Sequence, residues 1–199
     1  MTVPPFDPRL ARIPIRDSGE ELVDVRTSAP LWVAGPTWLR HGLVDRLVTA
    51  QSLLPRDVRL LIVDGYRTPG HHPACAPGCA IPPAVAPHPT GGAVDLTLSG
   101  ADDEALPLPA CCAGPIPPPD PKTGRLLAEA LVTAGLVNYP ARWWHWSYGD
   151  RFWAWVARSP HARYGPVHEP DRPPAGTGGA GALARRGGEP GDPRSGPGS

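Results

Sequence analysis

Proline and glycine supply 30 and 23 of the 199 residues, roughly 27% together, a share typical of low-complexity or disordered chains. The seven tryptophans indicate the opposite, because disordered segments are poor in large aromatic side chains. The two signals separate along the chain: every tryptophan lies between Trp32 and Trp155, and residues 169–199 hold no aromatic residue. We therefore expect one loop-rich domain over residues 1–168 and a disordered tail rich in Gly, Pro and Arg over residues 169–199.

The net charge and the hydropathy pattern limit the kinds of molecule that we expect this protein to bind. Nineteen basic residues balance nineteen acidic ones, so the sequence lacks the basic footprint of a nucleic-acid-binding protein. No apolar run approaches the length of a membrane span, and residues 1–17 lack the apolar core of a secretory signal. We expect a cytoplasmic protein whose partner is a small molecule, not nucleic acid or a membrane. The sequence predicts no oligomeric state.

The four cysteines form two clusters, Cys75-x3-Cys79 and Cys111-Cys112. A structural zinc site usually shows two pairs with gaps of two to four residues, and adjacent cysteines rarely ligate one metal together. Disulfides are uncommon in a cytosolic chain. Incidental loop thiols are therefore the favoured interpretation, with a second, structural zinc or a disulfide as the alternatives.

Two segments have the apolar periodicity of a helix. In residues 36–54 leucines and valines recur about every 3.6 residues, Pro36 suits the first turn and Pro55 ends the helix. Residues 122–134 repeat the pattern, and Gly135 is well suited to end that helix.

Short apolar or alternating runs predict strands at 22–25, 58–63, 93–98, 136–139, 143–148 and 152–156, the last two joined by Gly149-Asp150. In residues 93–98, Asp95 lies on the small, polar face of its strand, as the wall of a site would. These elements predict an α+β domain with two main helices and a small antiparallel sheet.

Three residues along these elements are suited to bind a metal ion. His88 and Asp95 stand seven residues apart around a Gly-Gly turn, and His145 follows in a strand where it would share a face with Trp143 and Ser147. Imidazole and carboxylate are zinc ligands, and a catalytic zinc takes three of them with one position open. Each residue also has a plainer interpretation: a hydrogen-bonded core histidine, a turn cap, and tryptophans that only fill the core.

Taken together, the motifs resemble a known family. VRLLIVDGYR at 58–67, HPTGGAVDLTL at 88–98 and NYPxxWWHWSYGDRFWAW at 138–155 are similar to the D-alanyl-D-alanine dipeptidases, the zinc peptidases of the vancomycin-resistance type related to zinc D,D-carboxypeptidases. GEELVDVR at 19–26 and LVDRLVTAQSLLP at 43–55 extend the resemblance, which runs from about Ile13 to Val156. It implies a fold of the hedgehog/D,D-peptidase type and the hydrolysis of D-alanyl-D-alanine or a related small dipeptide in cell-wall peptidoglycan metabolism.

The resemblance also implies roles for individual residues. His88, Asp95 and His145 would hold one Zn²⁺ per chain. Arg67, in the DGYR turn, would contact the substrate carbonyl and stabilise the oxyanion, a role that suits a permanently charged guanidinium.

The sequence departs from the family at the position of the general base. Family members carry Glu three residues before the last histidine ligand, where it takes a proton from the attacking water; here Arg142 stands there. Arginine has no acceptor and cannot act as a base, and losing such a group costs roughly 10²- to 10⁴-fold in rate. In a regular strand residue 142 would face away from His145. Because the family's Glu does reach the metal-bound water, the resemblance implies a bend between the two positions.

That departure leaves alternatives open. Asp64 or Asp150 could stand in as the base, or the chain could be a zinc-binding, non-hydrolytic relative in which Arg142 and Arg67 favour an anionic ligand. The pocket wall differs as well: the segment between Arg67 and His88 is shorter and richer in proline than in the family, and Ala86 replaces a common serine.

Overall fold

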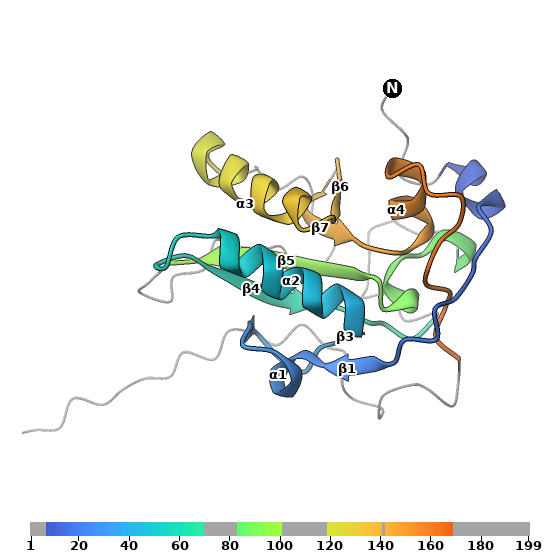
Figure 1. Ribbon diagram of the computed structural model, residues 1–199, viewed down its shortest axis with the longest axis horizontal. Coiled ribbons are helices and arrows are strands. Elements are labelled where there is room, and N and C mark those ends of the chain that lie inside the picture. The colour runs from blue at the N-terminus through green and yellow to red at the C-terminus, as the bar shows by residue number, and fades with distance from the viewer. Residues whose placement is uncertain (1–6, 70–82, 101–118, 141, 169–199) are drawn as a thin grey trace, which may run out of the picture.

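The computed structural model describes residues 7–69, 83–100, 119–140 and 142–168 (Figure 1). The four cysteines and the tail at 169–199 lie outside the described residues, so the expectations about thiols, a second zinc, a disulfide and disorder stay predictions. Within the described residues no helix combines the length and apolar character that a membrane span requires.

The main sheet is mixed, with strand order β2-β4-β5-β7-β6. Its strands are β2 (Trp32–Val33), β4 (Arg59–Asp64), β5 (Ala93–Ser99), β6 (Val137–Tyr139) and β7 (Arg142–Ser147). All neighbouring pairs are antiparallel except β2 and β4, which are parallel. A separate antiparallel pair joins β1 (Leu22–Asp24) to β3 (Trp38–Arg40). The predicted α+β class agrees with this arrangement, whereas the purely antiparallel sheet is wrong because β2 pairs in parallel.

The two long helices, α2 (His41–Leu53) and α3 (Pro121–Thr133), pack against one another and against the sheet (Figure 1). Their buried leucines join Ile62 of β4, Leu96 of β5 and Trp146 of β7 in one core cluster. Because Leu96 faces this core, Asp95 faces the other side of the sheet. The site residues therefore lie on the face opposite the long helices.

Both helix predictions are confirmed, with one boundary corrected. The first helix begins at His41 rather than Pro36, because residues 38–40 pair with β1 instead. The second begins one residue before the expected start, where the Asp120 carboxylate accepts hydrogen bonds from the first-turn amides of Lys122 and Thr123.

The predicted strand at 152–156 is wrong: Arg151–Val156 forms helix α4. Gly149 turns the chain with φ +80°, and Asp150 then caps the helix by accepting a 2.7 Å hydrogen bond from the amide of Trp153. Phe152 and Ala154 are both buried. Alternation of aromatic and small residues fits either structure, and the cap decides for the helix.

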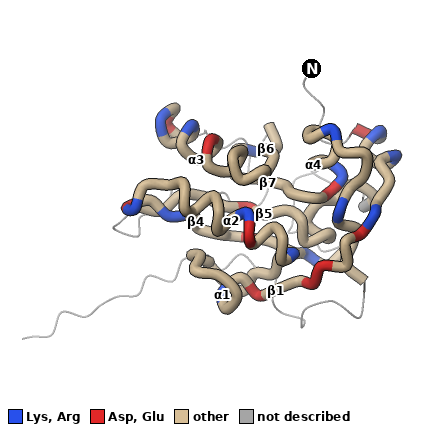
Figure 2. The backbone as a smooth tube through the Cα atoms, in the orientation of Figure 1, with Lys and Arg blue, Asp and Glu red and all other residues tan. Residues whose placement is uncertain are grey.

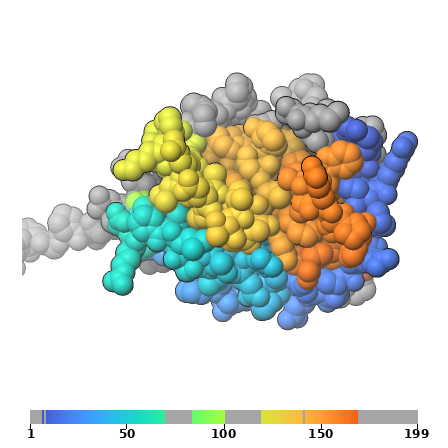
Figure 3. All heavy atoms as spheres, turned by 45° about the horizontal axis from the view of Figure 1, so that its top comes forward, coloured from blue at the N-terminus to red at the C-terminus, as the bar shows by residue number. Residues whose placement is uncertain are grey.

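The first and last described segments lie side by side (Figure 3). Ile15 forms a parallel bridge with Ala162, and the short helices η1 (Pro8–Arg12) and α4 pack together. A third short helix, α1 (Val25–Ser28), follows β1 directly. Charged residues of both signs are distributed over these outer elements (Figure 2).

Candidate metal centre

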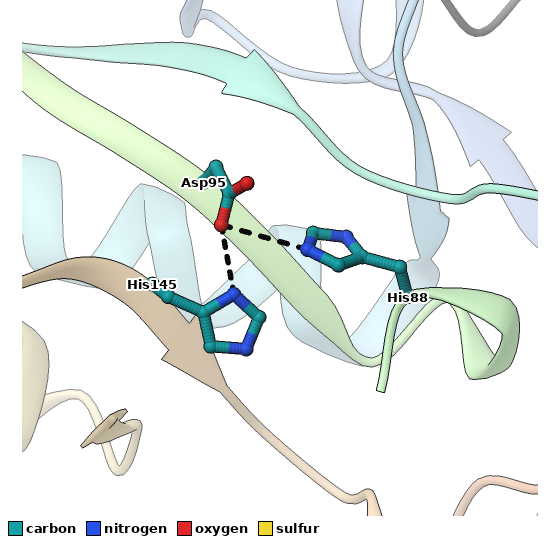
Figure 4. A group of neighbouring side chains, drawn as sticks. All are labelled: His88, Asp95 and His145. Atoms are coloured by element: carbon teal, nitrogen blue, oxygen red, sulfur yellow. Dashed lines mark hydrogen bonds and ion pairs between the residues drawn. The ribbon is translucent and has the colours of Figure 1, made fainter. Parts of the chain in front are cut away.

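His88, Asp95 and His145 come together from three separate elements (Figure 4). Asp95 in β5 is the direct partner of His145 in β7, and His88 opens the short helix η3 (His88–Thr90), which leads into β5. The Oδ1 atom of Asp95 lies 2.7 Å from Nδ1 of His145 and 3.5 Å from Nε2 of His88. These three residues are a group that could hold a metal ion.

Arg40, which is buried, holds the turn that carries His88 through its side chain and its backbone. The side chain of Arg40 donates to the carbonyl of Thr90 at 2.9 Å, and its backbone amide donates to the carbonyl of Gly91 at 2.9 Å. Gly91 has φ +68°, and a Cβ there would lie 2.4 Å from the side chain of Leu22. Only glycine fits this position, which explains the first glycine of the HPTGG motif.

One ring nitrogen of His88 is left open for a ligand. Its Nδ1 lies 2.6 Å from the carbonyl oxygen of Gly65. A carbonyl only accepts, so Nδ1 is the donor in this bond, and Nε2 is the ring nitrogen that faces Asp95. This Nε2 is buried and has no hydrogen-bond partner among the described residues. Buried polar atoms are normally satisfied, so the orphaned nitrogen is the observation that most directly points to a metal ligand.

Arg67 lies against the other oxygen of Asp95. Its guanidinium donates to Oδ2 of Asp95 at 3.1 Å and to Oδ2 of Asp64 at 2.5 and 2.8 Å. The DGYR turn thus orients Arg67 through Asp64 and places a cation beside the histidine–aspartate group. Side-chain exposures of 16% for Arg67 and 15% for Asp95 leave this pair largely shielded from solvent.

The protonation states also fit a metal. Burial disfavours the charged form of Asp95, but His88 and His145 outweigh it and hold the pKa of that carboxyl well below its usual range. Burial lowers the pKa of His145, although Asp95 partly opposes the change. An anionic carboxylate and neutral imidazoles are the forms that bind a metal. Two ligands of a tetrahedral zinc lie about 3.4 Å apart. The 3.5 Å separation between His88 and Asp95 matches this value, whereas the 2.7 Å separation between His145 and Asp95 is that of a hydrogen bond.

Arg142 begins β7 and is half-buried. Burial is the largest cause of the lowered pKa of His145, and the positive charge of Arg142 adds a smaller contribution. Arg142 therefore acts on the site electrostatically. Among the described residues no carboxylate forms an ion pair with Arg142.

The two carboxylates considered as substitutes for the base are both engaged. Asp64 accepts from Arg67 through Oδ2 and from the amide of Gly65 through Oδ1. Asp150 is buried and caps α4 through Oδ1, while its Oδ2 has no hydrogen-bond partner within the described residues. Burial raises the pKa of Asp150 to about 6.

The expected face of His145 needs correction. Trp143 packs against the core cluster that contains Trp146, so it does not share the face of His145 as regular alternation predicts. The structure also shows neighbours that the sequence analysis missed: Asn138 bonds to the backbone beneath His145, and the ring of Tyr139 meets His145 edge-on at 5.8 Å. Their position beside β7 follows from strand pairing, for which the sequence holds no local signal.

Comparison with known proteins gives one distant relative and no matching family model. A D-alanyl-D-alanine dipeptidase from Synechocystis sp. is 27% identical over a 143-residue alignment that covers 61% of this chain and 53% of that protein. The chain therefore spans about half the length of the curated relative it matches. The similarity agrees with the resemblance carried by the motifs, and the described fold is compatible with a D,D-peptidase-like architecture. The chain is thus similar in sequence, at a distant level, to a D-alanyl-D-alanine dipeptidase.

Proposed function

We propose that this protein binds one Zn²⁺ through His88, Asp95 and His145 and hydrolyses D-alanyl-D-alanine or a related small dipeptide, in peptidoglycan metabolism of the cytoplasm. The observation that carries the proposal is the buried Nε2 of His88, which faces Asp95 and has no hydrogen-bond partner among the described residues. The sequence similarity to a D-alanyl-D-alanine dipeptidase supports the substrate class.

Each side chain has a distinct part in this proposal. The two imidazoles and the carboxylate would hold the metal, which when bound supplies a Lewis acid for amide hydrolysis. The Arg67 guanidinium, fixed by Asp64, would meet the negative charge that develops on the substrate carbonyl oxygen. Gly65 keeps the ring of His88 oriented through its carbonyl, a typical outer-shell partner of a metal-bound histidine.

Proton transfer is the step of hydrolysis that this site supports least, and it leads to a second candidate function. Arg142 cannot accept a proton, and Asp64 is held by Arg67. The guanidinium of Arg142 has no ion-pair partner within the described residues, so it is available to an anionic ligand. A zinc-binding relative that binds a peptide carboxylate without cleaving it is therefore the alternative.

Metal content and turnover distinguish the two candidates. The full chain, purified and loaded with Zn²⁺, is assayed for release of D-alanine from D-alanyl-D-alanine beside Arg142→Glu and Arg142→Gln. The dipeptidase proposal expects turnover in the wild type and a gain of roughly 10²- to 10⁴-fold in Arg142→Glu alone. Arg142→Gln controls for loss of the positive charge.

The remaining outcomes are equally specific. One bound zinc with measurable affinity for the dipeptide, but no turnover in any of the three proteins, favours the non-hydrolytic alternative. A chain that binds no zinc, with a His88→Ala variant behaving identically, refutes both.

A further inference from the structure

The strand that carries His145 is bulged on one side only. Val137 pairs with Ser147 and Asn138 with Trp146, but the next residue of β6, Tyr139, pairs with Arg142. One step along β6 thus corresponds to four along β7. On its other edge, β7 keeps a regular register with β5, where His145 pairs with Asp95. Residues 143–145 therefore form a bulge toward β6, which we call the β7 bulge.

A bulge leaves backbone groups without their usual partners in the sheet, and here one side chain supplies a donor. The Nδ2 atom of Asn138 lies 3.2 Å from the carbonyl oxygen of Arg142 and 3.1 Å from those of Trp143 and His145. Two amide hydrogens serve three acceptors, so at least one bond is shared. Half-buried carbonyl groups need hydrogen-bond donors, and the side chain of Asn138 supplies a donor to carbonyl groups at both ends of the bulge.

The β7 bulge determines where the side chains of the strand point. Trp143 and Trp146, three residues apart, both pack toward the main core, and the indole of Trp146 donates to the carbonyl of Trp143 at 3.0 Å. His145 between them faces Asp95. In an evenly paired strand, Trp143 and His145 would share a face. The bulge thus allows the core tryptophans and the metal-site histidine to be satisfied together.

We infer that Asn138 is a positioning residue of the metal centre: its side-chain amide holds the β7 bulge, and the bulge aims His145 at Asp95 and His88. The part of this inference that concerns metal affinity rests on the proposed function. The part that concerns the geometry of the β7 bulge does not.

The test compares Asn138→Ala with a matched control in helix α2. Gln51 also uses a side-chain amide to bind backbone, donating to the carbonyl of Val58 at 3.0 Å and accepting from the amide of Leu60 at 2.7 Å. Gln51→Ala removes a comparable set of bonds without touching the metal centre. Asn138→Asp and Gln51→Glu form a second pair that keeps the side-chain shape and removes the donors.

The first readout is NMR of the metal-free protein. The wild type should show through-hydrogen-bond couplings from Asn138 Nδ2 to carbonyl carbons of the β7 bulge. Asn138→Ala should shift the carbonyl resonances of residues 142, 143 and 145 and the ring resonances of His145, whereas Gln51→Ala should leave them in place. If the wild type shows no such couplings and Asn138→Ala leaves the carbonyl resonances unshifted, the inference is overturned, whether or not Asn138→Asp folds.

The second readout is Co²⁺ binding, followed by its visible ligand-field spectrum and by competition with a chelator. Asn138→Ala should bind Co²⁺ about 10- to 100-fold more weakly, the range for loss of an outer-shell partner, with an altered spectrum. Gln51→Ala should match the wild type. Equal affinity and equal spectra in both alanine variants would refute the positioning role. A wild type that binds no Co²⁺ would instead refute the proposed function, and the NMR result would still decide the geometry of the bulge.

Discussion

Asp150 lets the energetic cost of one buried carboxylate be measured directly. Its Oδ1 caps α4, but its Oδ2 is buried without a hydrogen-bond partner among the described residues. Burial raises its pKa from the ordinary 3.8 to about 6. The replacement Asp150→Asn keeps an oxygen to accept from Trp153 and removes the charge.

The raised pKa determines the sign of the effect. Between pH 4 and 6 the folded protein holds a proton on Asp150 that the unfolded chain has released, so wild-type stability falls as pH rises through this range. The difference between 3.8 and about 6 corresponds to roughly 3 kcal/mol, at about 1.4 kcal/mol per pKa unit. Asp150→Asn should therefore gain up to roughly 3 kcal/mol over the wild type as pH rises from 4 to 8.

Urea unfolding of the metal-free wild type and Asp150→Asn at pH 4, 5, 6 and 8 measures this difference. Because all other titrating groups are present in both proteins, the difference between the two free energies isolates Asp150. Chelator is included throughout, since a cation near His88 would stabilise the Asp150 anion. A difference that stays constant from pH 4 to pH 8 would show that Asp150 is solvated or paired, contrary to the structure.

Three further predictions follow from the structure. Replacing Arg67 with Ala should lower dipeptide turnover by about 10²- to 10³-fold while leaving bound zinc at one per chain; loss of the zinc instead would assign Arg67 to metal retention. Gly149→Ala should destabilise the protein by about 2 kcal/mol or more in thermal unfolding, because φ is +80° and a Cβ would lie 2.5 Å from the ring of Tyr164. Gly100→Ala is the control, because a Cβ there would meet no atom of the described residues within 4 Å. Burial alone would raise the pKa of the Glu20 carboxyl, but hydrogen bonds from Tyr164 and from the amide of Gly42 outweigh it and lower that pKa. The stability deficit of Glu20→Gln should thus be greatest above pH 4.5 and shrink as the pH falls below it; a deficit independent of pH would contradict the assignment.

The sequence alone predicted those helices and strands whose signals lie within a short stretch of the chain. Helix α3 was predicted to within a residue at each end, because its apolar period lies within the segment and Gly135 marks its end. Strand β5 was predicted from its alternation, which also placed Asp95 on the face away from Leu96. The residues of the candidate metal centre were identified by motif resemblance, and the structure brings the three side chains together.

The tertiary structure alone decided which elements pair and how the ends of strands are shaped. Residues 152–156 are not such a case: the cap from Asp150, three residues before Trp153, selects the helix and is a local signal that the sequence analysis missed. Strand β2 has only two residues, and its parallel pairing with β4 has no local signature. The β7 bulge depends on Asn138, four residues from the nearest carbonyl it binds. The physical reason is common to the pairing of β2 and the β7 bulge: an apolar pattern reports that a side chain is buried, whereas the partner of a backbone or side-chain polar group is chosen by elements that meet only when the chain folds.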